Sequence, residues 1–303
     1  MMIESHDVVQ ILKKSRDKRN RDAERQRIFE KFFKRLNKRG ITLKQIFLED
    51  RCTMSITFDD IQSGINPDQG MKVAVHGPPG IGKSTLGAQF PGPLFFDFEG
   101  SLTNIDVPHF DLREKKFEET MDALRLLWGD DHKFESLIID TVDWLEIKIH
   151  DHVCEKMGIQ NIGDPDYGRG YSRALDHWKE FLDACEFLKN HKGMNIILLA
   201  HTKQGQVSDP MYGTYNRHTL KCRDKASELI VEWADMVLYA DMKVFLDEKK
   251  QGFTKTTTAH GGQRILHTQG KPAFVAKCRF SIPEELHMGY DHLINAINGK
   301  ETA

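Results

Sequence analysis

Two hydrophobic patterns alternate along most of this chain. From residue 54 onward, short runs rich in β-branched and aromatic residues alternate with stretches whose apolar residues recur at helical spacing. This alternation is typical of a parallel sheet with crossover helices. The predicted strands are residues 71–76, 93–98, 136–140, 195–200, and 236–241 with a continuation over 243–246. The predicted helices are residues 84–89, 117–128, 142–157, 172–190 and 225–233.

Two further β-like runs, residues 263–268 and 273–280, follow these elements. The segment between them, Gln269-Gly270-Lys271-Pro272, has the composition of a hairpin turn. We therefore expect an α/β fold with a mostly parallel central sheet, helices on both faces and an antiparallel hairpin at one edge.

The first 53 residues follow a different pattern. Between residues 22 and 38, five apolar side chains recur at helical spacing, and Gly40 follows as a stop signal. We expect residues 1–53 to be a helical extension and residues 54–303 to be the α/β domain. Met54 is a candidate start of translation, which the mass of the intact native protein would test.

Composition excludes a membrane-spanning protein. Hydrophobic residues make up 39% of the chain and charged residues 29%. No window approaches the roughly 18 apolar residues that a membrane-spanning helix needs, and the N-terminus lacks the ordered regions of a secretory signal. We therefore expect a cytoplasmic protein.

The net charge of −2 hides an asymmetry between the two parts of the chain. Residues 1–53 carry 15 Lys and Arg against 8 Asp and Glu, a net charge of +7, which leaves −9 for residues 54–303. A basic arm on an acidic body suits contact with nucleic acid or with an acidic face of a neighbouring subunit. A solvated helix surface would have the same composition.

A glycine-rich segment follows the first predicted strand and fits the P-loop pattern GxxxxGK[ST]. Its glycines allow backbone N–H groups to turn inward around a β-phosphate, and the following helix presents its positive end to the same anion. Lys83 would bridge the β- and γ-phosphates, and the Ser84 hydroxyl would ligate Mg²⁺. The segment therefore predicts a site for ATP with Mg²⁺. The predicted nucleotide-binding residues are Gly77, Pro78, Pro79, Gly80, Ile81, Gly82, Lys83, Ser84 and Thr85.

Two later strands end in carboxylates. Residues 137–140 (LIID) form an apolar run, and Asp140 at its end is the predicted acid that orients Mg²⁺ through its water. Asp143 is interpreted as a charge at a helix N-terminus. Residues 94–100 (LFFDFEG) form a second apolar run, and Glu99 is the predicted base that polarises the attacking water. An ordinary turn after a strand would use the same residue types as this second segment.

The order of these motifs resembles the RecA-type branch of P-loop ATPases, in which the catalytic glutamate ends the strand after the P-loop helix. The wider string looks like phage-encoded nucleotide-binding proteins of the RecA fold, some of which, the Sak-type proteins, are ATP-dependent single-strand annealing recombinases. The resemblance covers residues 70–285 and implies a RecA-like P-loop NTPase fold. The matching segments are GPPGIGKS (77–84), QFPGPL (89–94), DFEG (97–100), IIDT (138–141), DYGxGY (166–171), LAH (199–201), WAD (233–235) and AKxRF (276–280).

The resemblance also implies roles for three later residues. His201 takes the position of a polar residue that senses the γ-phosphate, although RecA-type proteins usually have Asn or Gln there; Gln204 is a second candidate. A strand-end histidine in a hydrogen-bond network would look the same. Lys277 and Arg279 match a Lys-x-Arg that, in RecA-like and hexameric-helicase relatives, reaches the neighbouring subunit's γ-phosphate. Two solvated charges at a sheet edge are the alternative.

Two segments interleave tyrosines with basic residues, which suits single-stranded nucleic acid because the rings stack on bases and the cations follow phosphates. RecA relatives place DNA-binding loops after the corresponding strands. Ordinary surface loops also carry Tyr and Arg. The residues are Tyr167, Arg169, Tyr171 and Arg173 in segment 161–173, and Lys203, Tyr212, Tyr215, Arg217 and Lys221 in segment 203–221. The sequence therefore predicts two DNA-binding loops.

From these observations we expect a RecA-fold ATPase that acts on single-stranded DNA in recombination or annealing. The protein would be phage-encoded, would work in the host cytoplasm and would self-associate into a ring or filament. A single-strand-binding or replication protein is a further expected partner. Two alternatives use the same parts: a helicase-like motor or loader ring, and a nucleotide-dependent switch that binds a protein partner.

Overall fold

The computed structural model of the protein describes residues 70–211, 213–251 and 254–300. The predicted helix over residues 22–38, the extension 1–53 and the boundary at residue 54 lie outside these residues.

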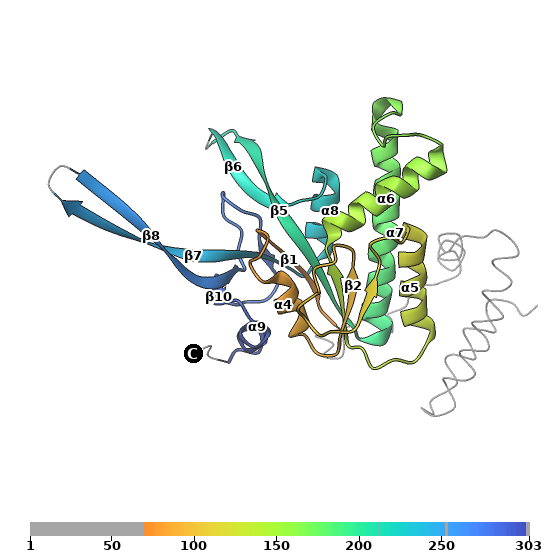
Figure 1. The fold of residues 1–303 in the computed structure, drawn as a ribbon, viewed down its shortest axis with the longest axis horizontal. Coiled ribbons are helices and arrows are strands. Elements are labelled where there is room, and N and C mark those ends of the chain that lie inside the picture. Colours follow the sequence, from red (N-terminus) through yellow and green to blue (C-terminus); the bar gives the residue numbers. More distant parts are fainter. Residues whose placement is uncertain (1–69, 212, 252–253, 301–303) are drawn as a thin grey trace, which may run out of the picture. The chain divides into compact units, whose positions relative to one another are not determined.

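Strands and helices alternate along much of the described chain (Figure 1). The strands are β1 (Lys72–Gly77), β2 (Pro93–Asp97), β3 (His109–Asp111), β4 (Ser136–Asp140), β5 (Asn195–Asp209), β6 (Gly213–Leu220), β7 (Met236–Gln251), β8 (Thr254–His267), β9 (Lys277–Cys278) and β10 (Glu285–His287). The helices are α4 (Lys83–Ala88), α5 (Phe117–Gly129), α6 (Val142–Met157), the short 3-10 helix η2 (Asp166–Gly168), α7 (Arg169–Lys192), α8 (Asp224–Trp233) and α9 (Tyr290–Ile297).

The strands form one sheet in the order β10-β8-β7-β1-β5-β4-β2-β3. All neighbours from β7 to β3 are parallel, whereas β8 is antiparallel to β7 and β10 is antiparallel to β8. The predicted α/β class, with a mostly parallel sheet and an antiparallel edge, is confirmed. Because parallel strands end at the same edge of a sheet, β1, β2, β4 and the first half of β5 deliver their last residues to one place.

Both faces of the sheet are buried, because successive side chains of a strand point to opposite faces. In β4, Leu137 and Ile139 pack on the face covered by α5, α6, α7 and α8, and Ile138 packs on the face covered by α4 and α9. The helices predicted on both faces are therefore confirmed. In the part of the chain that the structure describes, no helix has the length and apolar character needed to cross a membrane.

The predicted hairpin between residues 263–268 and 273–280 is wrong in its pairing. The first run lies largely in β8, whose antiparallel partners are β7 and β10, and β9 in the second run pairs with β7. A local turn does form between them, since Lys271 and Phe274 exchange backbone hydrogen bonds of 3.1 Å. Turn composition predicts where the chain reverses, but it does not determine which strand the returning segment joins.

Strand β5 continues beyond its predicted end at residue 200. It forms an antiparallel ribbon with β6, from the pair Thr202 and Leu220 to the pair Asp209 and Gly213. Much of segment 203–221, predicted to be a loop, is therefore a β-ribbon. A two-stranded ribbon exposed to solvent buries few side chains, so its sequence lacks the apolar alternation that marks a strand. The short strands β3 and β10 and the helix α9 were also not predicted.

A buried histidine joins β1 to its surroundings just before the phosphate loop. His76 Nε2 lies 2.7 Å from the Val275 carbonyl oxygen, and Nδ1 lies 3.0 Å from the Thr202 hydroxyl. Since a carbonyl can only accept, Nε2 carries the hydrogen and Nδ1 accepts from Thr202. Burial lowers the pKa of His76 to about 4, so the imidazole is neutral near pH 7. It ties the end of β1 to β5 and to the segment before β9.

Candidate nucleotide-binding site

The phosphate loop connects β1 to α4 at the carboxyl edge of the sheet. Gly80 and Gly82 adopt φ angles of 76° and 104°, a conformation that favours glycine. Ile81, between them, is buried in the core and anchors the loop. Helix α4 begins at Lys83, so its first N–H groups, which have no partner within the helix, point toward the concave side of the loop. This is the local structure that the P-loop pattern predicts.

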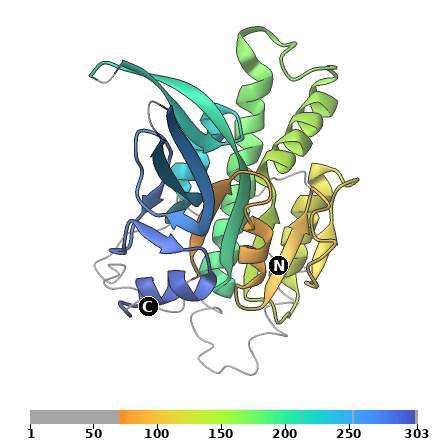
Figure 2. The same ribbon diagram turned by 60° about the vertical axis from the view of Figure 1, so that its left-hand side comes forward.

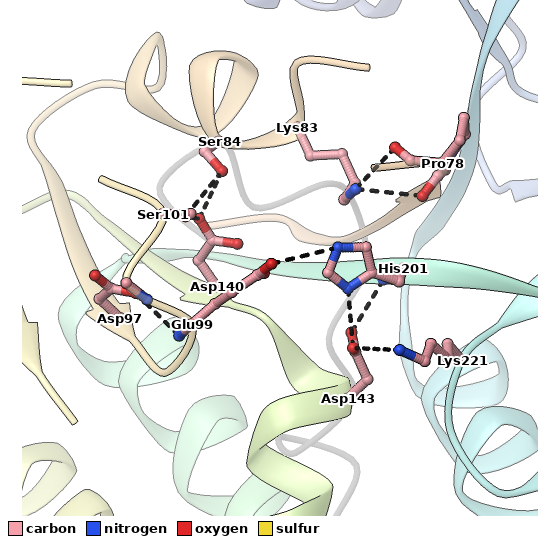
Figure 3. Close-up of polar contacts among 12 residues, drawn as sticks. Pro78, Lys83, Ser84, Asp97, Glu99, Ser101, Asp140, Asp143, His201 and Lys221 are labelled. Carbon is pink, nitrogen blue, oxygen red and sulfur yellow. Dashed lines mark hydrogen bonds and ion pairs between the residues drawn. The ribbon is translucent and has the colours of Figure 1, made fainter. Parts of the chain in front are cut away.

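The ammonium of Lys83 lies inside this loop. Its Nζ donates to the carbonyl oxygens of Gly77 and Pro78, both at 3.2 Å (Figure 3). Burial lowers the pKa of Lys83, and the carboxylates of Asp140 and Glu99 act in the opposite direction. In the described part of the chain, this buried ammonium donates its hydrogen bonds to two neutral carbonyls, and a bound phosphate would supply the countercharge that the carbonyls do not.

Asp140 ends β4 beside the first turn of α4. Its Oδ2 accepts hydrogen bonds from the Ser84 hydroxyl at 2.6 Å and the Ser101 hydroxyl at 2.9 Å. Burial raises the pKa of Asp140, and the nearby charge of Asp97 adds to the rise. A hydroxyl and a buried carboxylate in contact are oxygen donors of the kind that Mg²⁺ prefers, so Ser84 and Asp140 fit the ion. Ser101 was not predicted.

The turn after β2 positions Glu99. Asp97 Oδ1 accepts the backbone N–H groups of Glu99 at 3.1 Å and Gly100 at 2.6 Å, and Gly100 has a φ of 80°. This hydrogen-bonded turn aims the Glu99 side chain across the cleft, as Figure 3 shows. Burial raises the pKa of Glu99, and the neighbouring His201 opposes the rise.

His201 lies opposite Glu99, where β5 leaves the core of the sheet. Its Nε2 is 3.6 Å from Glu99 Oε1, and its Nδ1 is 2.9 Å from Asp143 Oδ2. The backbone N–H of His201 also donates to Asp143 Oδ1 at 3.0 Å. Burial by itself would raise the pKa of Asp143, but these two hydrogen bonds outweigh it and the pKa is lowered. Asp143 lies in the first turn of α6, as predicted, and it also orients His201, which was not predicted.

These side chains surround one cleft of about 330 Å³. Of the predicted residues, the structure brings together Lys83, Ser84, Glu99, Asp140 and His201. Gln204, the second sensor candidate, is exposed on β5. The residues that line the cleft are Pro79, Gly80, Gly82, Lys83, Ser84, Thr85, Glu99, Ser101, Ile105, Asp140, Thr141, His201 and Arg264.

Lys277 and Arg279 lie at the opposite edge of the sheet from this cleft. Strand β9 pairs with the first residues of β7, and the Arg279 N–H donates to the Asp235 carbonyl beside Lys72, where β1 begins. The Lys277 ammonium donates to the carbonyls of Val231, Glu232 and Ala234 at 2.7–3.1 Å, where it caps the end of α8. The half-exposed Arg279 guanidinium pairs with the Asp235 carboxylate at 2.9 Å. Neither side chain lines this cleft.

The two Tyr- and Arg-containing segments lie at the same end of the molecule. The connection from α6 to α7 and the tip of the β5–β6 ribbon are both uppermost in Figures 1 and 2. Tyr167 is fully exposed in η2 with a φ of 57°. Tyr171, by contrast, stacks under the Arg223 guanidinium at 3.5 Å, and Arg217 donates to the Tyr215 hydroxyl at 3.2 Å. The ring of Tyr167 is therefore available to a ligand, whereas Tyr171 has a partner within the protein.

Comparisons with known proteins agree with a P-loop domain. The profile of a family described as an AAA domain matches residues 69–280. No curated protein matches the chain. Among solved structures, the chain is similar to a RadB recombinase, with 13% identity over 72% of this chain and 87% of that chain and a TM-score of 0.39. It is also similar to the flagellar accessory protein FlaH from Methanocaldococcus jannaschii, with 10% identity over 69% and 90% of the two chains and a TM-score of 0.33. Scores this low carry no inference about function.

Proposed function

The chain belongs to the AAA domain family, and from this premise we propose that it binds ATP with Mg²⁺ and hydrolyses it while acting on single-stranded DNA in recombination or annealing. The observation that carries the proposal is the convergence of Lys83, Ser84, Glu99 and Asp140 on one cleft. The four residues follow or end three different strands, β1, β2 and β4, as ligand sites in parallel sheets do.

The cleft supplies a separate group for each need of the reaction. The P-loop N–H groups and Lys83 hold the phosphates, and Ser84 and Asp140 would hold Mg²⁺, which neutralises charge on the phosphates when bound. Glu99 orients a water molecule and accepts its proton. Burial raises the pKa of this carboxyl, which makes it a better proton acceptor once ionised.

His201 is proposed to report on the far end of the triphosphate. Asp143 holds the backbone N–H and the Nδ1 atom of His201 with one hydrogen bond each, so Nε2 faces Glu99 and the cleft. A donor in this position would contact the γ-phosphate and would lose that contact after hydrolysis. Because β5 runs directly from His201 into the β5–β6 ribbon, the same strand links the cleft to the proposed DNA-binding end.

We expect single-stranded DNA to stimulate ATP turnover, and we expect Tyr167→Asn to weaken DNA binding. The exposed ring of Tyr167 suits stacking on a base, and Asn tolerates the positive φ at this position. Stacking contributes about 1–3 kcal/mol per base, so affinity should fall by about 5- to 150-fold. Turnover and fluorescence-anisotropy titrations with a labelled oligonucleotide, at two salt concentrations, would measure both effects.

Leu126→Ala is a matched control, because it removes another exposed large side chain from α5, away from both segments. Turnover without stimulation, together with the absence of salt-sensitive binding, would exclude a DNA-dependent activity and favour a nucleotide-dependent switch. Strand displacement on a forked duplex would favour a helicase-like motor or loader. Annealing of complementary strands without displacement would favour the recombinase.

We further propose that subunits assemble so that Arg279 completes the site of a neighbour. The proposal rests on its place at the sheet edge opposite the cleft and on its half-exposed guanidinium, whereas Lys277 is held by the end of α8. A guanidinium that reaches a neighbour's phosphates is worth about 10³-fold or more in turnover. Arg279→Ala and Lys83→Ala proteins should each be inactive, and their mixture should recover part of the turnover.

The mixture should recover turnover because Arg279→Ala subunits supply an intact cleft and Lys83→Ala subunits supply an intact Arg279. Mixtures that co-assemble by light scattering but show no recovered turnover would contradict the shared site. The Lys83→Ala protein alone gives the background turnover.

The resemblance to phage Sak-type recombinases also motivates two broader proposals, a phage origin and a single-strand-binding or replication protein as partner.

A further inference from the structure

An arginine from outside the parallel sheet reaches the phosphate loop. Arg264 lies in β8, opposite Met242 of β7, and its carbonyl accepts the Met288 N–H at 3.0 Å. The side chain is exposed and lines the cleft together with the P-loop residues. The antiparallel edge of the sheet therefore contributes a cation to the cleft from a position 180 residues beyond Ser84, the last residue of the P-loop pattern.

The guanidinium of Arg264 approaches the middle of the loop. A Cβ placed on Gly82 would lie 2.9 Å from the Arg264 Nη1 atom, and the next neighbouring side chain, Met288, would be 3.9 Å away. A side chain at position 82 would strain the φ of 104°, and the Arg264 guanidinium would have to shift to make room for it. The guanidinium therefore lies beside the P-loop in the lining of the cleft.

Among the residues that the structure describes, Arg264 has no carboxylate partner, unlike two other exposed cations. Lys243 of the neighbouring strand β7 pairs with Glu285 at 3.1 Å, and Arg279 pairs with Asp235 at 2.9 Å. Within the described residues, no ion pair or side-chain hydrogen bond engages the Arg264 guanidinium. An unpaired guanidinium beside a phosphate cradle has five donors available for an anion.

We infer that Arg264 is a nucleotide-binding residue that binds the diphosphate portion of the nucleotide beside Gly82 of the P-loop. The inference rests on the proposed binding of ATP. A planar guanidinium forms paired, charge-assisted hydrogen bonds with phosphate oxygens. Since Arg264 meets the loop at Gly82, whose neighbourhood surrounds the β-phosphate in P-loops, it contributes to the binding of ADP as well as ATP.

Equilibrium binding tests this assignment. Arg264→Ala should weaken the affinity for both MgATP and MgADP by about 10- to 100-fold, the size expected for charge-assisted hydrogen bonds. Arg264→Lys should recover part of the loss, because it restores the charge but not the fork. Competition of inorganic pyrophosphate against a fluorescent ADP analogue should weaken by the same factor as ADP. Lys243→Ala, which removes a paired cation from the neighbouring strand β7, should bind both nucleotides like the wild type.

Affinities of Arg264→Ala within about twofold of the wild type would overturn the inference. So would a loss confined to ATP, which would place the residue at the γ-phosphate, or a loss for ADP without a loss for pyrophosphate, which would place it at the base or ribose. Arg264→Gln gives a second neutral variant if the alanine protein fails to fold. Failure of the wild-type protein to bind any nucleotide would instead remove the proposed function and this inference together.

Discussion

Glu99→Gln is expected to slow ATP hydrolysis by about 10²- to 10⁴-fold while leaving ATP affinity close to that of the wild type. The amide cannot accept a proton from water, but it has nearly the same size and keeps the turn that Asp97 forms with the backbone of residues 99 and 100. Single-turnover hydrolysis and equilibrium binding, measured on the same preparation, would separate the two effects. The variant should also accumulate the ATP-bound state.

Glu114→Gln provides the matched control, because Glu114 is exposed before α5 and does not line the cleft. Its turnover should equal that of the wild type. Near-normal turnover of Glu99→Gln would contradict the assignment of Glu99 as the base. The segment would then be an ordinary turn after a strand. A loss of ATP affinity equal to the loss of turnover would point to a binding role instead.

Asp140→Asn is expected to reduce hydrolysis by about 10²- to 10³-fold and to raise the Mg²⁺ concentration needed for half-maximal turnover. The amide oxygen can still accept the hydroxyls of Ser84 and Ser101, but the charge that attracts the cation is lost. Magnesium titrations of turnover and of nucleotide binding would measure the change.

Stability provides an independent check on Asp140. Because burial raises the pKa of this carboxyl, its ionised form is disfavoured in the folded protein, and stability from this group falls as the pH rises through the folded pKa. Without nucleotide at neutral pH, Asp140→Asn should therefore unfold at a temperature no lower than the wild type. Asp122→Asn, at an exposed position on α5, is the control. A clear loss of stability with unchanged Mg²⁺ dependence would show that Asp140 is structural.

Local pattern was sufficient for the elements of the parallel sheet. Strand Ser136–Asp140 and helix Val142–Met157 have the bounds predicted from sequence, because a buried apolar run and an amphipathic repeat each carry their own signal. The antiparallel part was predicted less well. Strands β8 and β9 pair with β7 and not with each other, and the β5–β6 ribbon has too few buried residues to be recognised.

The residues of the candidate site also fall into two groups, those that local motifs predict and those that only the folded structure identifies. Lys83, Ser84, Glu99 and Asp140 belong to motifs whose spacing is local, and the strand order brings them to one cleft. Ser101 and the second role of Asp143 depend on contacts across the site that no spacing encodes. The sequence pattern treats Lys277 and Arg279 as two equivalent cations, yet the structure gives them different partners. Whether either reaches a neighbouring subunit stays a prediction.

By itself, the sequence determined the phosphate loop, the apolar strands and the acids at their ends, because the chemistry of each lies within a few consecutive residues. Only the tertiary structure decided which distant side chains complete the cleft. Arg264 is the clearest case, since its approach to Gly82 depends on β8 folding back beside β7 and on β7 lying next to β1. Contacts of this kind follow from the order of strands in the sheet, which no short stretch of sequence specifies.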